Sequence, residues 1–463
     1  MRKLPLAIWA MVVGAFAMGA DEFIVAGVVQ EIAQALGVSI GAVGHLESVY
    51  ALGVAIGAPV FVAAGTRFGR RAMLLTTTAV FLAGNLISAL GPTYGTIMTG
   101  RIVSATAHGA FRGIAAVFAA ELVDPARKGR AVALVFSGLT ASTVLGAPLG
   151  AAVGQTLGWR FTFWTLVVFG GIALLGLLAS LPSAAPVTAH HPAPAIHSHD
   201  HAPATHSHDH AAEHGHDHAA AGSEFDGLDA HALAHLGGGG HGPTLREQVA
   251  ALGRPAVWVA LLTTLLGYGG VFTSYVYIAP QLTDVAGFHR MWITPLLLLF
   301  GAGLFVGNHL GGKLADRALL PSIFGTLAAL AIALFAMGPA LTSRTATVIM
   351  MFLFGLAAFA VVAPLQLRVM TAAGHAPDVA SAANISAFTL GSALGIYLGG
   401  AAIDGGLGLA SVNWIGGLLT TRGLSVAVLG WLMFDRRRTH TDAATTEHHE
   451  HPVHQEIGAH HHH

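Results

Sequence analysis

Residues 319–339 read LLPSIFGTLAALAIALFAMGP, an unbroken stretch of apolar and small residues without a single charge. As a helix that rises about 1.5 Å per residue, such a stretch is long enough to cross the ~30 Å hydrocarbon core of a bilayer. A bilayer offers no water to unpaired backbone groups, so an apolar run of this length is read as a spanning helix. This stretch alone predicts a membrane protein.

Similar stretches fill most of the 463-residue chain, and together they predict an all-α membrane protein with twelve spanning helices. The twelve spans are expected near 5–30, 42–65, 72–91, 93–119, 130–155, 159–181, 255–280, 291–315, 319–339, 345–370, 379–404 and 411–434. The first lacks a signal-peptidase-like site and is too long for a signal sequence, so we expect it to be retained as a span.

The composition agrees with this class. Charged residues make up 10% of the chain and hydrophobic residues 54%, with a mean hydropathy of +0.65, whereas a soluble domain carries about 25% charged residues. The net charge of -1 gives no reason to expect nucleic acid as a partner. Cysteine is absent, which excludes disulfides and thiolate chemistry. We recognise no nucleophile–base pair, phosphate cradle or HExxH zinc helix, so an enzyme is not expected.

Lysine and arginine predict the orientation, because they concentrate on the cytoplasmic side. With both termini in the cytoplasm, sixteen of the 22 basic residues lie on the inner side, three lie in outer connections and three fall inside spans. The outer three are Arg160, Arg290 and Arg344, and the three inside spans are Arg101, Arg112 and Arg422. We therefore expect a multi-pass protein of a bacterial-type cytoplasmic membrane.

The same orientation divides the chain into four parts. We expect a six-helix bundle over 1–182, a cytoplasmic His-rich linker without a core over 183–254, a second six-helix bundle over 255–435 and a His-rich cytoplasmic tail over 436–463.

The two bundles follow one plan, as expected for a duplicated transporter. Gly53 and Gly57 in the second span match Gly303 and Gly307 in the eighth, each 250 residues later. A glycine at every fourth position recurs in the fifth and eleventh spans, where it makes a smooth helix face for close packing. These glycines are Gly146, Gly150 and Gly154 in the fifth span and Gly391, Gly395 and Gly399 in the eleventh.

Several motifs carry a family resemblance. The loops Gly65-Thr-Arg-Phe-Gly-Arg-Arg71 and Gly312-Lys-Leu-Ala-Asp-Arg317 resemble the signature loop of the major facilitator superfamily. The stretch Gly146-Ala-Pro148-Leu-Gly150 resembles the antiporter signature of its drug:proton branch. Residues 22–27, 50–59, 101–109 and 384–388 are similar to arabinose-efflux and chloramphenicol-resistance-like exporters.

The resemblance implies two six-helix bundles, related by a pseudo-two-fold axis, that rock about a cavity open to one side at a time. It implies exchange of a small drug- or sugar-like molecule for protons, no required cofactor, and we expect a monomer. The loops that brace the moving halves would comprise Arg67, Gly69, Arg70, Arg71, Gly312, Asp316 and Arg317. The helix-packing positions would be Gly146, Pro148, Gly150, Gly391 and Gly395.

The chain departs from the family pattern at two positions. Thr66 stands where the first signature loop usually has Asp, so the latch attributed to that Asp would exist only at Asp316. An Ala separates Gly146 from Pro148 within the antiporter signature, which weakens the inference of proton exchange from that motif alone.

Ionisable residues inside spans are costly and therefore point to function. Asp21 and Glu22 lie about 25 Å along the first span. In the fourth span, His108 and Arg112 follow Arg101 by seven and eleven residues, offsets that return to nearly the same helix face. These five residues are the candidate proton-coupling and cavity residues.

We expect Glu22 to carry the proton and Arg101 to be its partner or competitor. Removal of a carboxyl from water raises its pKa and a nearby guanidinium lowers it, so a cavity that opens and closes can load and release a proton. His108 is a second candidate relay, and Arg112 would favour an anionic or chelated substrate. The alternatives are a static buried ion pair and an interfacial position. The single histidines His45 and His309 are expected to pack rather than to bind a ligand.

The linker repeats one unit, His-x-His-Asp-His, three times, and fourteen of the 28 histidines lie in 190–241. The repeated histidines are His197, His199, His201, His206, His208, His210, His214, His216 and His218. Imidazole and carboxylate suit Ni, Zn, Co or Cu ions, so divalent metal binding is expected as a physical property. Capture of a transported metal, regulation by metal or pH, and an inert linker all remain open. An exporter of a metal or metal chelate is the alternative function, and a non-transporting metal sensor is a third.

Overall fold

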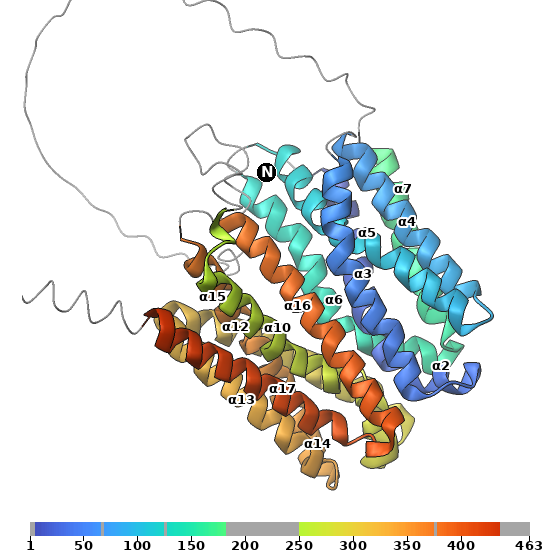
Figure 1. Ribbon diagram of the computed structural model, residues 1–463. Helices are drawn as coiled ribbons and strands as arrows, with labels where there is room; N and C mark the ends of the chain where they lie inside the picture. Colours follow the sequence, from blue (N-terminus) through green and yellow to red (C-terminus); the bar gives the residue numbers. More distant parts are fainter. Residues whose placement is uncertain (1–4, 66–68, 125–126, 182–249, 375–376, 436–463) are drawn as a thin grey trace, which may run out of the picture.

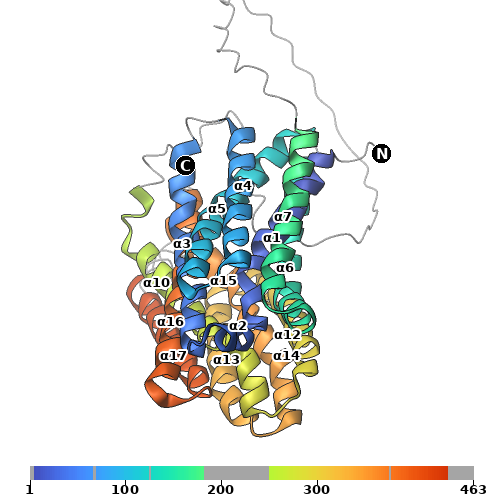
Figure 2. The ribbon, with the colours of Figure 1, turned by 90° about the vertical axis from the view of Figure 1, so that its right-hand side faces the viewer.

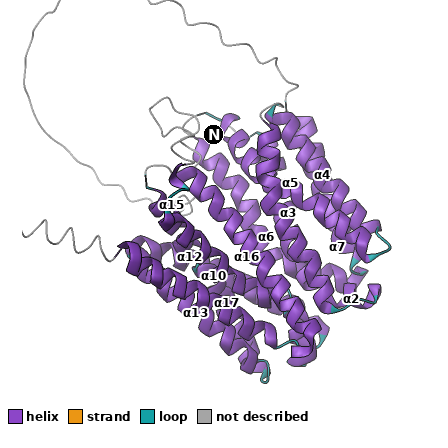
Figure 3. Ribbon diagram, viewed as in Figure 1, coloured by secondary structure: helices purple, strands orange, loops and turns teal. Residues whose placement is uncertain are grey.

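The computed structural model describes residues 5–65, 69–124, 127–181, 250–374 and 377–435, without the side chains of 58–65 and 378. The predicted loop residue Arg67, the repeated histidines of the linker and the C-terminal tail lie outside these residues. Figure 3 shows helices joined by short loops throughout the described chain, and no strand occurs in it. Twelve of the helices are long and apolar enough to cross a membrane, as predicted.

The helices form two groups of six spans (Figure 1). The first group comprises α1 (Leu6–Phe23), α2 (Val29–Leu36), α3 (Ile40–Gly65), α4 (Arg70–Leu90), α5 (Tyr94–Glu121), α6 (Lys128–Leu157) and α7 (Arg160–Ser180). The second comprises α10 (Pro255–Tyr275), α11 (Ile278–Pro280), α12 (Ile293–Arg317), α13 (Leu319–Ala340), α14 (Arg344–Ala360), α15 (Val362–Ala373), α16 (Pro377–Ala402) and α17 (Ser411–Gly430). Figure 2 shows the long helices running roughly parallel to one another.

The surface of the bundle is apolar and its interior holds buried charges, the reverse of a soluble protein. Leu175 and Ile332 are 68% and 67% exposed, whereas Asp21 and Arg101 are fully buried. Apolar side chains at the surface are stable only against lipid, which agrees with the predicted membrane location. Arg422 is exposed on α17, and no described contact explains it.

The glycine stripes make equivalent contacts in the two groups. Gly150 of α6 packs against the carbonyl oxygen of Ile24, which follows α1, and Gly395 of α16 packs against that of Gly269 in α10. Gly57 of α3 packs on Thr106 of α5, and its match 250 residues later, Gly307 of α12, packs on Leu356 of α14. The repeat seen in the sequence is therefore a repeat of helix pairs.

Three spans that we expected to be continuous are interrupted. α10 ends at Tyr275 and α14 ends at Ala360, four to five residues before Pro280 and Pro364. Proline has no N–H and clashes with the carbonyl of the residue four positions earlier, so each proline breaks its span there. α1 ends at Phe23 and continues as a 3-10 turn over Ile24–Gly27, among β-branched residues and glycine that weaken a helix.

The two groups are joined at one end of the bundle, which we call the sealed end and define by three pairs of residues. Gln30 donates to Asp284 at 2.9 Å, Ser48 of α3 donates to the carbonyl oxygen of Ala393 in α16 at 2.8 Å, and the rings of His45 and Tyr397 stack at 5.3 Å. α3 and α16 lie side by side along this contact (Figure 1). We call the contact between these two helices the α3–α16 seam.

Candidate functional site

Three buried ionisable side chains from three helices meet in the first group of spans. Arg101 of α5 pairs with Asp21 of α1, and its Nη2 lies 2.6 and 2.7 Å from the two carboxylate oxygens of Glu47 in α3. Asp21 and Arg101 are 0% exposed and Glu47 is 3% exposed. We call these three residues the buried triad.

Asp21 is held at both carboxylate oxygens. Oδ1 accepts from Arg101 Nη1, and Oδ2 accepts from Asn85 Nδ2 of α4 at 3.2 Å. Arg101 Nη2 also donates to the backbone carbonyl of Asp21 at 3.1 Å. Asp21 lies in the last turn of α1, where carbonyls lack intrahelical donors, so the interruption after Phe23 helps to supply this contact.

Tyr50 and His108 extend the buried triad along α3 and α5. The Arg101 guanidinium lies 3.9 Å from the centroid of the Tyr50 ring, a cation–π contact. The Tyr50 hydroxyl and His108 Nδ1 are 2.9 Å apart, and His108 Nε2 is buried without a hydrogen-bond partner. The predicted stripe on the fourth span thus brings Arg101 and His108 to one buried site, as their spacing indicated.

Glu22 occupies a different environment from Asp21. It is partly exposed and makes no hydrogen bond or ion pair among the described residues. Glu22 lies within electrostatic range of Arg112 and of Tyr268 and Tyr275, two residues of α10 in the opposite group. Glu22 also lies within electrostatic range of Arg101 and Asp21, so its charge acts on both the buried triad and the opposite group, although it is hydrogen-bonded to neither.

Aromatic side chains line the space between the two groups. The Phe23 ring lies 6.1 Å from Phe272 and 5.9 Å from Tyr275, both across the boundary between the groups. The crevice they enclose is small and apolar. It is lined by Phe23, Val271, Phe272, Tyr275, Phe300, Leu304 and Phe359.

The structure differs from the predicted pairing. We expected Arg101 to be the partner or competitor of Glu22; Arg101 binds Asp21 and Glu47 directly, and Glu22 lies only within its electrostatic range. Glu47, Tyr50 and Asn85 were not among the predicted site residues. A signal for Glu47 was present, since it is a lone acidic residue inside the second predicted span.

The remaining candidates lie away from the buried triad. In the first signature loop, Arg70 pairs with Glu121 at the end of α5, and Arg71 is half-buried beside Gly69. In the second, Asp316 and Arg317 are exposed at the end of α12, after Gly312. His309 is exposed on α12.

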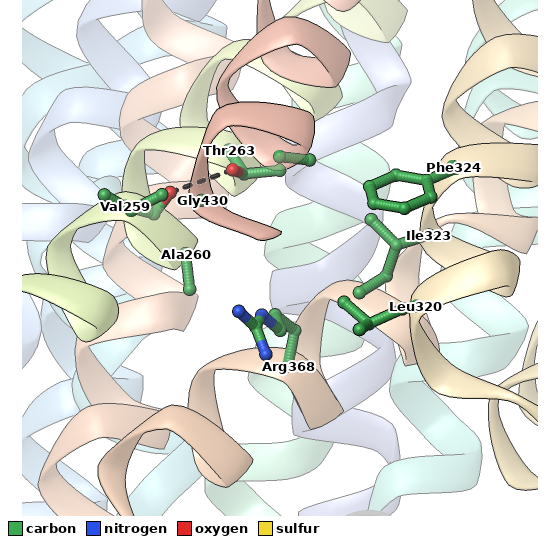
Figure 4. Close-up of a pocket in the computed structure, with 9 residues that line it drawn as sticks. Val259, Ala260, Thr263, Leu320, Ile323, Phe324, Arg368 and Gly430 are labelled. Atoms are coloured by element: carbon green, nitrogen blue, oxygen red, sulfur yellow. Dashed lines mark hydrogen bonds between the residues drawn. The ribbon is translucent and has the colours of Figure 1, made fainter. Parts of the chain in front are cut away.

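A second pocket lies within the other group and does not reach the buried triad (Figure 4). It is a narrow pocket between α10, α13, α15 and α17. Its one charged lining residue, Arg368, pairs with Asp435 at 2.6 Å and so fastens α15 to the end of the last span. Figure 4 also shows Thr263 donating to the carbonyl oxygen of Val259 within α10.

Comparisons with known proteins place this architecture. Residues 11–396 match the family model of the Major Facilitator Superfamily. The inner membrane transport protein YdhP of Escherichia coli K12 is 36% identical over 417 residues, which cover 90% of this chain and 94% of that protein. The chloramphenicol resistance protein of Streptomyces lividans is 32% identical, with 92% and 96% covered, and the putative transporter AraJ of E. coli K12 is 30% identical, with 95% and 97% covered.

Proposed function

Because the chain belongs to the Major Facilitator Superfamily, we propose that it exports a small molecule from the cytoplasm in exchange for protons. The family and the relatives are membrane transporters and not enzymes, and the chain is a multi-pass membrane protein. The direction of transport, the coupling to protons and the substrate are the parts that we propose.

We propose that the sealed end faces the outside. The three arginines expected in outer connections all lie at this end: Arg160 donates to the carbonyl oxygen of Gly91, Arg344 to that of Gly287, and Arg290 pairs with Glu31. The basic residues at the opposite end then lie in the cytoplasm, as the positive-inside rule requires. In this orientation the structure is closed towards the outside.

The buried triad is the observation that carries proton coupling. Asp21, Glu47 and Arg101 lie within spanning helices, where an ionisable group is costly and is kept for ion or proton pathways. Two acidic groups compete for one guanidinium, so a change in water access alters how many protons the buried triad holds. Opening and closing of the α3–α16 seam as the two groups rock would supply that change.

We place the substrate in the aromatic crevice between the two groups. Phe23, Phe272 and Tyr275 offer flat apolar surfaces that accept many shapes, and Glu22, which precedes Phe23 in α1, lies within electrostatic range of Arg112. A relative that carries the name of a chloramphenicol resistance protein makes chloramphenicol the first compound to test.

A growth experiment tests export. A bacterial strain without its own efflux pumps expresses the wild-type chain or its Arg101→Ala variant at matched membrane levels, and both are challenged with chloramphenicol, tetraphenylphosphonium, arabinose and Ni²⁺. We expect the wild type to protect against at least one organic compound and the variant to lose that protection. Equal growth of the wild-type and empty-vector strains on every compound would contradict export.

The metal alternative depends on the repeated His-x-His-Asp-His unit of the linker, which lies outside the described residues. Deletion of 190–241 separates the two functions in the same growth experiment. Loss of Ni²⁺ protection with retained drug protection would favour a metal-gathering linker. Unchanged protection against every compound would favour an inert linker.

A further inference from the structure

The charges of the buried triad do not balance. Asp21 and Glu47 contribute two negative charges when ionised, and Arg101 contributes one positive charge. All three are buried, and an uncompensated charge in the low-dielectric interior is strongly unfavourable. The buried triad must therefore hold one additional proton in this conformation.

The neighbouring groups do not remove the need for that proton. Glu22 adds negative charge, which Arg112 offsets. His108 is the other group that could be cationic, but the positive charges of Arg101 and Arg112 both repel a further positive charge there. A doubly protonated His108 would also leave its buried Nε2–H without an acceptor. Three tyrosines lie within electrostatic range of Glu47, and each is a neutral hydrogen-bond donor. They are Tyr50, Tyr275 and Tyr277.

The two carboxyls, Asp21 and Glu47, differ in their hydrogen-bond donors. Each carboxylate oxygen of Asp21 has its own donor, Arg101 for Oδ1 and Asn85 for Oδ2, which is the arrangement of an ionised carboxylate. The two oxygens of Glu47 share a single donor atom, Arg101 Nη2. One oxygen of Glu47 can accept that hydrogen bond while the other carries a proton. Glu47 is therefore the better site for the additional proton.

Asp21 and Glu47 also differ in how close they lie to the α3–α16 seam. Asp21 is enclosed by α4 and α5 within its own group, whereas Glu47 precedes Ser48, whose hydroxyl binds Ala393 across the α3–α16 seam. Gly44, one turn earlier on α3, packs against the Tyr277 hydroxyl of the opposite group. Separation of α3 from α16 would admit water beside Glu47 before it reached Asp21.

We propose that Glu47, rather than Glu22, carries the exchanged proton. This inference rests on the proposed function and assigns its coupling residue. When the sealed end opens, the Glu47 carboxylate takes one proton from outside water. When that end closes and the opposite end opens, Glu47 releases the proton to the cytoplasm, and the water that enters solvates the ionised carboxylate until the next proton arrives. Asp21 stays ionised and holds Arg101 in place.

Infrared spectroscopy tests the protonation of Glu47 without a substrate. The purified full-length protein in lipid at neutral pH should show a protonated carboxyl C=O band. The Glu47→Gln variant should lack the band, and Glu22→Gln should retain it. Removal of either carboxyl of the buried triad balances its charge, so a glutamine variant alone does not show which carboxyl holds the proton. Conservative variants do. Glu47→Asp should shift the frequency of the band, and Asp21→Glu should leave that frequency unchanged.

Two spectroscopic outcomes overturn the proposal. One is a band that persists in Glu47→Gln, and the other is a band that moves in Asp21→Glu but not in Glu47→Asp. Circular dichroism and a thermal unfolding curve of each variant establish that the compared proteins are folded. Neither outcome depends on transport, so failure of the Glu47 assignment is distinguishable from failure of the export function.

A flux experiment tests the role in coupling. Everted membrane vesicles are given a pH gradient, and accumulation of radiolabelled tetraphenylphosphonium or chloramphenicol is compared with its exchange in the absence of a gradient. We expect Glu47→Gln to lose gradient-driven accumulation and to retain exchange, because its triad is neutral without a proton. Retained accumulation would overturn the proposal. Absence of both activities in the wild type would contradict the proposed function instead.

Discussion

The carbonyl oxygen of Val144 in α6 lies against Gly301 of α12 in the opposite group. Pro148, four residues later in α6, has no N–H to donate to that carbonyl. A helix that contains proline thus presents a carbonyl without its intrahelical donor where α6 contacts α12 of the opposite group. Pro148 was expected to be a packing residue, and its helix contacts Gly301 of α12 through Val144.

Gly301→Val should impair transport more than folding. A Cβ at this position would lie 2.6 Å from the Val144 oxygen, so the two groups would have to move apart where α6 meets α12. We expect overpacking of about 1–3 kcal/mol, seen as a lower unfolding temperature, and a larger loss of drug export. Gly325→Val is the matched control, because a side chain at Gly325 meets no atom within 4 Å. Equal effects of the two variants would contradict a special role for Gly301.

Disulfide trapping should lock the sealed end. The chain contains no cysteine, so Ser48→Cys with Ala393→Cys introduces the only two thiols. The Ser48 hydroxyl and the Ala393 carbonyl oxygen are 2.8 Å apart, which places the two positions within reach of a short bis-methanethiosulfonate cross-linker that forms a reducible disulfide with each cysteine. We expect cross-linking to abolish export and reduction to restore it. Full activity of a completely cross-linked protein would show that α3 and α16 need not separate.

Arg101→Lys should retain charge but lose coupling. Arg101 binds Asp21 through Nη1 and Glu47 through Nη2, and a lysine ammonium cannot reproduce this planar fork. We expect folded protein at near-normal levels with gradient-driven accumulation reduced by about an order of magnitude, because the charge-assisted contacts that hold both carboxyls are lost. Lys128→Arg, on an exposed residue at the start of α6, controls for a generic exchange of basic residues. Normal accumulation by Arg101→Lys would show that the bidentate geometry is dispensable.

Gly395→Ala should destabilise the second group of helices. The added methyl would collide with the carbonyl oxygen of Gly269 and lie 2.8 Å from Thr273 Oγ1. We expect a loss of about 1–3 kcal/mol, measured as a lower unfolding temperature in detergent. Gly325→Ala should be neutral or stabilising, since alanine is the better helix former where space is free. If both variants unfolded at the wild-type temperature, the glycine stripe would not govern packing of α16 on α10.

The spans could be predicted from the sequence because apolar length is a one-dimensional property. Residues 319–339 and the observed Leu319–Ala340 agree within a residue, and the 250-residue repeat indicated two halves with one plan. The interruptions at Tyr275 and Ala360 also had a local signal, in Pro280 and Pro364, that hydropathy alone does not register.

The partners of Arg101 could not be predicted in the same way. Asp21 and Glu22 are adjacent in the sequence, and only the rotation of α1 between α5 and α10 decides which of them meets the guanidinium. Glu47 comes from a third helix, α3. The helical periodicity of the fourth span cannot indicate which residues of α3 face it. The roles assigned to His197 and the other linker histidines stay predictions.

Proton release on drug addition tests the central claim most directly. Everted vesicles that contain the protein are energised to an acidic interior, and a trapped fluorescent pH indicator is followed while chloramphenicol, or another compound that the growth experiment identifies, is added outside. The account predicts that the drug collapses part of the pH gradient in wild-type vesicles and leaves it unchanged in Glu47→Gln vesicles. Drug accumulation in wild-type vesicles without any proton efflux would contradict it.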